Sequence, residues 1–142
     1  LGLTMEYLET QGVPVVGYQT DKLPSFFTRT SPFDVNYRLD TATEVAEMMK
    51  AKWDMNLEGG MVIANPIPEE FAMEDSFINK VIDEAVKEAE SLGITGKDVT
   101  PFLLGKIKDV TEGKSLEANI ALVKNNAKVG AQIAVAFGKI SQ

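Results

Sequence analysis

The chain has 142 residues, a formal net charge of −7 and a pI near 4.6, with 44% hydrophobic and 25% charged residues. This length allows one domain with a real core but not two ordinary domains, and the composition is that of a soluble globular protein. The acidic balance and the presence of only two arginines, Arg29 and Arg38, argue against nucleic-acid binding. A small phosphorylated ligand remains compatible with lysines and backbone N–H groups.

The chain contains no cysteine and no histidine. This excludes disulfides, thiolate nucleophiles, Ser-His-Asp triads and zinc sites built on His and Cys, whereas a hard cation on carboxylates stays open. No run of about 18 apolar residues is present, so we expect no membrane span. The first residues, Leu1 to Thr4, lack an initiator Met and the pattern of a signal peptide. We expect them to lie within a longer reading frame and the protein to be cytoplasmic.

The N-terminal third predicts one helix and one or two strands. Thr4 to Gln11 is typical of a helix, and Gly12 ends it. Val13 to Tyr18 then predicts a short buried strand. Gln19 to Pro32 predicts a long ordered loop, and Tyr37 to Leu39 a short edge strand.

A capping box marks the next helix. Thr41 and Glu44 have the spacing in which each side chain bonds the other residue's backbone N–H, so the helix is expected to run from there to about Met55. Met61 to Ala64 predicts a second buried strand, and Asn65 to Glu70 a loop at its carboxyl end.

The last part of the chain predicts three helices. Ser76 to Leu92 has the apolar spacing of an amphipathic helix. Thr100 is expected to cap a second helix, with proline at its first position and Gly113 beyond its end. Ser115 is expected to cap a final helix that runs to about Phe137.

The predicted elements define an α/β fold that is incomplete. Alternating strands and helices, with continuous apolar strands, indicate a layered α/β arrangement. Two or three short strands cannot make a sheet that covers five helices. We therefore interpret residues 1–142 as a helix-rich part of a larger α/β domain.

Amides in the final helix are the main candidates for ligand binding. Asn119 and Asn126 share one helical stripe, and Asn125 lies about 100° away. A buried amide without partners costs about 1–3 kcal/mol. One hypothesis is that these amides bind a sugar hydroxyl or a pyrimidine edge. The alternative is that they bond neighbouring backbone or support helix packing.

Two loops could also carry chemistry. The segment from Asn65 lies past the carboxyl end of a strand, where α/β enzymes bind ligands, and its Glu69 and Glu70 could be an acid–base pair or metal ligands. The alternative is a solvated loop. Phe26-Phe27-Thr28-Arg29 could hold a phosphate or form a contact between subunits, or could simply pack the loop.

Other chemistries find little support in the pattern. Lys114 and Lys124 could act as Schiff-base amines only if desolvated, and both positions are typical of solvated side chains. The glycines form neither a dinucleotide-binding fingerprint nor a Walker A loop.

Four blocks along the whole chain resemble, in order, those of the pseudouridine-5'-phosphate glycosidases, also called the indigoidine synthase A-like family. The blocks are Leu3–Val15, Phe26–Arg29, Gly60–Pro68 and Thr100–Ala127. The resemblance implies reversible cleavage of pseudouridine 5'-phosphate to uracil and ribose 5-phosphate by an α/β/α layered, trimeric protein that uses a divalent ion, usually manganese. It also implies a ribokinase-like pseudouridine kinase in the same pathway.

The resemblance places most of the family's chemistry before this chain. The Schiff-base lysine, the proton-donor glutamate, the substrate-binding lysine and the metal-binding aspartate all precede the segment that matches Leu1. No metal ligand is therefore assigned here. The Ser-Leu-x-x-Asn block assigns Asn119 as a catalytic and substrate-binding residue. Asn126 and Asn65 are the further candidates for substrate binding.

Three hypotheses follow. The first is the C-terminal part of a single glycosidase domain, inactive alone. The second is a non-catalytic module for oligomer assembly, or a degenerate homologue, which would bind neither uracil nor ribose 5-phosphate. The third is an unrelated domain that binds a phosphosugar, which would need a phosphate cradle that no motif indicates.

Overall fold

The computed structural model describes residues 1–25 and 27–141, with Asp75 described by its backbone alone. In these residues three short strands lie among five α-helices and two 3-10 turns, Glu69–Phe71 and Gly96–Asp98. In chain order the elements are α1 (Gly2–Thr10), β1 (Val15–Tyr18), β2 (Tyr37–Leu39), α2 (Ala42–Asp54), β3 (Val62–Ala64), α3 (Asp75–Ser91), α4 (Val99–Val110) and α5 (Lys114–Ile140).

The strands form one parallel sheet in the order β2-β1-β3. Val16 of β1 lies opposite Tyr37 of β2 and Ile63 of β3. Val15, Val16 and Gly17 are buried, as a central parallel strand requires. The predicted helix-rich α/β class with two or three short strands is confirmed.

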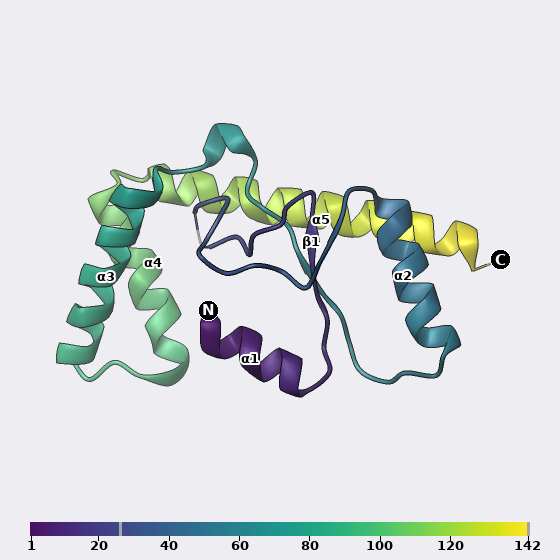
Figure 1. Cartoon of the computed structure of the whole chain (residues 1–142). Coiled ribbons are helices and arrows are strands. Elements are labelled where there is room, and N and C mark those ends of the chain that lie inside the picture. Colours follow the sequence, from purple (N-terminus) through teal and green to yellow (C-terminus); the bar gives the residue numbers. More distant parts are fainter. Residues whose placement is uncertain (26, 142) are drawn as a thin grey trace.

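Helices α2 and α5 cover one face of this sheet. Val45 of α2 packs with Val129 and Ile133 of α5, and Ile63 lies against this cluster from the sheet. Towards the C-terminus Trp53 and Phe137 meet edge to face, with ring centroids 5.3 Å apart. Figure 1 shows α5 running the length of the molecule behind the sheet, from α4 to α2.

A second hydrophobic cluster lies at the other end of α5. There the α3–α4 hairpin buries Ile78 and Ile107 against Ala118. Phe27 and Ile67 join this cluster from the two loops that leave the sheet. One long helix thus connects the sheet layer to the helical hairpin.

The described residues of the loop between β1 and β2 fold back on one another, as expected of an ordered loop. The Leu23 N–H donates to the Phe33 carbonyl at 2.8 Å, and the Val35 N–H to the Asp21 carbonyl at 3.1 Å. An ion pair of 2.6 Å joins Lys22 to Asp34 across the same loop.

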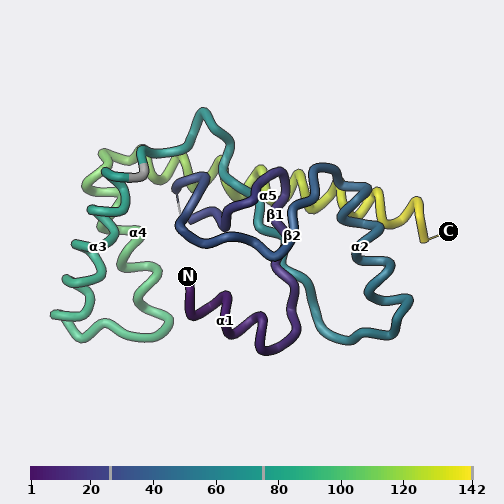
Figure 2. The backbone as a smooth tube through the Cα atoms, in the orientation of Figure 1, coloured from purple at the N-terminus to yellow at the C-terminus, as the bar shows by residue number. Residues whose placement is uncertain are grey.

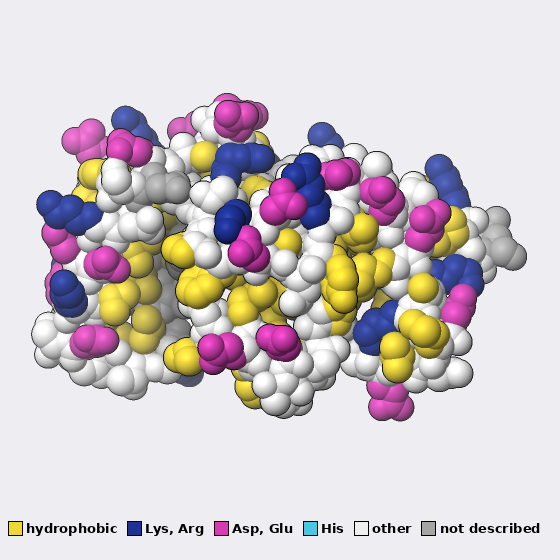
Figure 3. All heavy atoms as spheres, in the orientation of Figure 1, with side chains coloured by type: hydrophobic (Ala, Val, Ile, Leu, Met, Phe, Trp, Pro, Cys, Tyr) yellow, Lys and Arg dark blue, Asp and Glu magenta, His cyan; other side chains and the backbone are white. Residues whose placement is uncertain are grey.

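Helix α1 is the least packed element. None of its residues is buried, and Leu3 and Tyr7 are largely exposed. It lies at the amino end of β1, away from α5 (Figure 2). On the face shown in Figure 3, hydrophobic side chains gather in several groups across the middle of the molecule, separated by charged ones.

The prediction that Thr100 caps a helix is wrong. Helix α4 begins at Val99, directly after the 3-10 turn, so Thr100 and Pro101 lie within its first turn. Val99 packs against the hydrophobic cluster of the hairpin, which favours the earlier start. Proline is tolerated at the third helical position because N–H groups of the first turn have no helical partner.

The prediction that Ser115 caps the final helix is also wrong. Gly113, with a left-handed φ of +85°, is the cap of α5, and Ser115 is buried in the first turn. Its N–H donates to the Thr111 hydroxyl at 3.1 Å, so Thr111 is the residue whose side chain caps this N–H group. The helix also runs three residues past the predicted end, to Ile140.

Within the described residues, the helices are all too short or too polar to cross a membrane.

Candidate functional site

All three strands end at the same edge of the sheet. Gln19, Asp40 and Asn65 directly follow β1, β2 and β3. The carboxyl edge of a parallel sheet is where α/β proteins bind ligands, because the loops diverge there and leave a crevice. The candidate site is therefore sought at this edge.

The chain turns sharply after β1. A Cβ atom on Gly17 would lie 2.1 Å from the Thr20 carbonyl oxygen, so only glycine fits. Gln19 has a left-handed φ of +59°, which is uncommon for a residue with a side chain. Its backbone N–H donates to Leu39 and its side-chain amide to Asp40, each at 2.9 Å. These bonds hold the strained residue in place at the edge.

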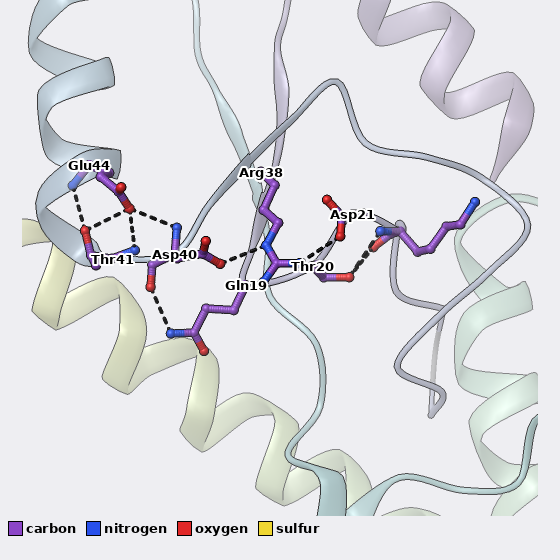
Figure 4. Close-up of polar contacts among 8 residues, drawn as sticks. Gln19, Thr20, Asp21, Arg38, Asp40, Thr41 and Glu44 are labelled. Carbon is purple, nitrogen blue, oxygen red and sulfur yellow. Dashed lines mark hydrogen bonds and ion pairs between the residues drawn. The ribbon is translucent and has the colours of Figure 1, made fainter.

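A polar network joins the ends of β1 and β2 (Figure 4). Arg38 donates to Asp40 at 2.8 Å and to Asp21 at 2.7 Å, and these hydrogen bonds raise the pKa of the guanidinium. Glu44 accepts from the N–H groups of Asp40 and Thr41 and from the Thr41 hydroxyl. These bonds lower the pKa of the Glu44 carboxyl, the Asp40 N–H most of all. The predicted capping box is confirmed.

Two of the predicted site residues meet in the structure. The Asn65 amide nitrogen donates to the side-chain oxygen of Asn126 at 2.9 Å, which links the end of β3 to the middle of α5. Next to this pair, Asn125 donates to the Pro66 carbonyl at 3.3 Å. These contacts are of the kind that the packing alternative predicted, and each amide keeps further hydrogen-bonding capacity.

Asn119 lies apart from this pair. Asn126 lies seven positions further along α5, which is about 10 Å along the helix axis. It is partly buried beside Ala118, and no described residue makes a hydrogen bond to its amide. The amide is therefore free to bind a group from outside the described chain.

A polar hollow opens at the carboxyl edge, and we call it the carboxyl-edge hollow. It has a volume of about 360 Å³. Its walls come from the end of β1, the loop after it, the end of β3 and the middle of α5. The lining residues are Tyr18, Gln19, Arg29, Asn65, Pro66, Pro68, Asn125, Lys128, Val129 and Gln132.

A second hollow, of about 570 Å³, lies between α2, β3 and α5 and is mostly apolar. Asn65 and Asn126 line it together with Trp53 and Ile133. Asn65 lines both hollows, so the hydrogen-bonded amide pair stands where they adjoin.

The remaining loop candidates fall outside these hollows, except for Arg29. Glu69 and Glu70 are exposed in a 3-10 turn, as a solvated loop requires. Phe27 is buried in the second hydrophobic cluster, and the Arg29 guanidinium donates to the Ile67 carbonyl. Phe26 lies outside the described residues.

The lysine that the structure does bury was not singled out from the sequence. Lys114 and Lys124 are exposed, whereas Lys52 is only 8% exposed. The Lys52 ammonium donates to the carbonyls of Leu57, Glu58 and Gly59, the first at 3.1 Å. An ammonium bonded in this way holds the loop after α2, which is a structural role.

In the described part of the chain, no three acidic side chains converge as a site for a metal ion.

The parallel sheet, with amides and two cations at its carboxyl edge, makes this chain a helix-rich part of an α/β fold. The sequence profile of the indigoidine synthase A-like proteins matches residues 1–136. A protein of Clostridium botulinum named pseudouridine-5'-phosphate glycosidase is 61% identical over all 142 residues, which are 46% of that protein. Its namesake in Escherichia coli is 56% identical over 141 residues, 99% of this chain and 45% of that protein.

Two solved structures have the same fold as this chain. A prealnumycin C-glycosynthase in complex with ribulose 5-phosphate has a TM-score of 0.86 at 33% identity, over 98% of this chain and 46% of that one. An indigoidine synthase A-like protein of Thermotoga maritima has a TM-score of 0.81 at 37% identity, over 93% of this chain and 43% of that one. This chain belongs to the indigoidine synthase A-like family, and it spans about half the length of the relatives that it matches.

Sequence reasoning missed part of the carboxyl-edge hollow. Lys128 and Gln132 line it, and the sequence analysis predicted neither as a site residue. The pattern held a clue, because Asn125, Lys128 and Gln132 recur at steps of three and four and so form one polar stripe of α5. Gln19 could have been found as the residue that directly follows a buried strand.

Proposed function

We propose that this chain is the C-terminal part of a pseudouridine-5'-phosphate glycosidase. The reaction would break the C–C bond between the ribose and the uracil ring, with uptake of one water, and release uracil and ribose 5-phosphate. The observation that carries the proposal is the 61% identity over the entire chain to a relative of that name. The ribulose 5-phosphate bound to a structural relative adds support for a sugar phosphate as ligand.

In this proposal the chain supplies one wall of the substrate pocket. Asn119 binds the substrate through its amide, for which no described residue competes. Asn65 and Asn126 contribute from the carboxyl edge, where their mutual hydrogen bond sets the position of both. The nucleophilic lysine, the acid and the metal ligand are expected in the part that relatives have and this chain lacks.

The oligomeric state, the metal ion, the location and a pathway partner are proposed as well. By resemblance to the family we include a homotrimer, a manganese ion held by residues outside this chain, a cytoplasmic location and a ribokinase-like pseudouridine kinase in the same pathway. The exposed apolar side chains of α1 and of the outer face of α5, such as Tyr7 and Val123, are consistent with burial in a larger assembly.

The test is a chimera that joins the N-terminal part of the Clostridium botulinum relative to this chain. We expect it to release uracil from pseudouridine 5'-phosphate, measured by liquid chromatography. Asn119→Ala in the chimera should lower turnover at least about tenfold, the cost of losing one well-placed hydrogen bond of about 1.4 kcal/mol.

Asn79→Ala is the matched control, because Asn79 is an exposed amide on α3 far from the sheet edge. It should leave turnover unchanged. Equal turnover of the Asn119 and Asn79 variants would remove Asn119 from the site. A folded chimera that neither cleaves the substrate nor binds uracil or ribose 5-phosphate would instead favour the non-catalytic assembly module.

A further inference from the structure

Helix α5 carries an exposed apolar stripe along its outer face. Its members recur at alternating steps of four and three residues, which places them on one side of the helix. They are Leu116, Ile120, Val123, Ala127, Gly130 and Ala134, and all six are exposed. Val123 is 59% exposed, and a Cβ atom on Gly130 would meet nothing within 4 Å beyond its own stretch of helix backbone. The stripe extends over about 27 Å of the helix.

The stripe is separate from the face that α5 turns towards the core. At the helical period, the buried face is centred about 125° away around the axis, and it consists of Ser115, Ala118, Val129 and Ile133. A third face, about 100° from the stripe on its other side, carries Glu117, Lys124 and Lys128. A helix that is apolar on two faces is typical of one buried between two layers of a larger fold.

The stripe differs from the isolated apolar residues that any surface carries. Val135 of the same helix is also 59% exposed, but its helical neighbours include Gln132 and Lys139. Single residues of this kind are ordinary on soluble proteins. A continuous apolar row marks an interaction site, because water disfavours the exposed area.

Asn119 stands at the border of the stripe. It is three residues from Leu116 and four from Val123, so these two side chains flank its amide on the helix surface. Asn119 is partly buried, and no described residue makes a hydrogen bond to its amide. A partner that covers the stripe would therefore cover this amide as well. The amide would then need a polar group from the partner, or from a ligand held between them.

The length of the relatives indicates the occupant. This chain corresponds to 46% of the Clostridium botulinum relative, so more than half of that protein lies outside the matched region. In the proposed function, the other part supplies the groups that act on the substrate bound by Asn119. That part must therefore come within reach of the same face of α5. A second copy of this chain would add another Asn119 but none of those groups.

Resting on the proposed function, we propose that the apolar stripe of α5 is the surface on which the N-terminal part of the complete protein packs. Asn119 then lies at the boundary between the two parts. Burial of the large side chains, such as Leu116 and Val123, stabilises this contact. The small residues further along the stripe, such as Gly130, let the backbone of the partner approach closely.

The test uses single cysteines, because the chain has none of its own. Val123→Cys is made in the 142-residue chain and in the chimera with the N-terminal part of the relative. The rate of labelling by a maleimide is measured in both, with the unsubstituted proteins as background. We expect labelling at least about tenfold slower in the chimera, because a thiol under the contact reacts only when the two parts separate.

Val135→Cys is the matched control. It replaces the same residue type at the same exposure on the same helix, but about 120° away from Val123 around the axis. Its labelling rate should be the same in both proteins. As a second measurement, Val123→Glu should lower the urea unfolding midpoint of the chimera, whereas Val135→Glu should leave it unchanged. Neither glutamate should alter the midpoint of the 142-residue chain, where both positions are exposed.

Equal labelling of the Val123 cysteine in the chain and in the folded chimera would overturn the inference. Protection in the chain alone that increases with its concentration would also overturn it, because a second copy would then cover the stripe. Protection in the chimera that is lost on dilution would have the same meaning. A protected stripe in a chimera that releases no uracil would support the packing and contradict only the proposed function. An active chimera with an unprotected stripe would contradict only the packing.

Discussion

Single residues at the carboxyl edge determine how the loops leave the sheet. Gly17 lets the chain turn back so closely that the Thr20 carbonyl occupies the space of a Cβ atom. Gln19 is held in a left-handed conformation by bonds to Leu39 and Asp40. Glu44 satisfies two backbone N–H groups at the start of α2. Gly17 and Gln19 shape the wall of the hollow that follows β1, whereas Glu44 fixes the start of α2.

The Glu44 carboxylate should make stability depend on pH. Its pKa is lowered by the N–H of Asp40 and the bonds from Thr41. Its stabilising contribution is therefore complete above the ordinary glutamate pKa of 4.5 and is lost as the pH falls through the lowered value. We expect a carbon-detected titration to place the midpoint of Glu44 below 4.5.

Glu44→Gln should abolish that part of the acid sensitivity in urea unfolding midpoints measured from pH 7 downwards. Glu47→Gln, an exposed change on the same helix, removes none of these bonds and serves as the control. A Glu44 midpoint at or above the ordinary value would contradict the role of the capping box.

At the scale of elements, the start of α5 depends on a side chain of the preceding turn. The buried Thr111 hydroxyl donates to the Ile107 carbonyl at 2.7 Å and accepts from the Ser115 N–H at 3.1 Å. Thr111→Val keeps the shape but leaves that buried N–H without a partner. We expect a loss of about 1–2 kcal/mol in the free energy of unfolding, measured by urea denaturation.

Thr100→Val tests whether the Thr100 side chain contributes less to stability than that of Thr111. Thr100 is exposed in the first turn of α4 and no described residue accepts or donates a bond at its side chain. The change should alter stability by less than about 0.5 kcal/mol. A larger loss at Thr100 than at Thr111 would restore the capping role that the sequence pattern predicted.

For the whole molecule, stability is expected to be uneven. The two hydrophobic clusters are joined by α5, whereas α1 buries no residue and has no capping side chain. Amides of α1 should therefore exchange with deuterium at least about a hundredfold faster than those around Val129 and Ile133. Hydrogen exchange followed by mass spectrometry measures this, with the Ile107 region of α4 as a second protected reference. Equal protection of α1 and α5 would mean that α1 is packed in solution.

Much of the fold could be predicted because local patterns control it. The capping box at Thr41, the strands β1 and β3 and the break at Gly12 all depend on a few residues, and the structure confirms them. The prediction that the second strand is buried is wrong, because Val62 is exposed and only Ala64 of β3 is buried. The helix starts at Thr100 and Ser115 were wrong because packing of Val99 and the buried Thr111 outweighed the local capping preference.

The site was only partly predictable, for the same reason. Asn65 and Asn126 were selected for their residue type and position, and their meeting required α5 to cross the end of β3. Lys128 and Gln132 gained their place only through that crossing, and Lys52 was buried only because a loop wrapped around it.

By itself, the sequence determined the class of fold, the order of its elements and the family, because these rest on composition, short-range periodicity and ordered motifs. Only the tertiary structure decided which polar groups share a cavity and which apolar side chains of α5 stay exposed. Those facts depend on contacts between residues about 60 positions apart, such as Asn65 with Asn126, and such contacts leave no periodic trace in a single sequence.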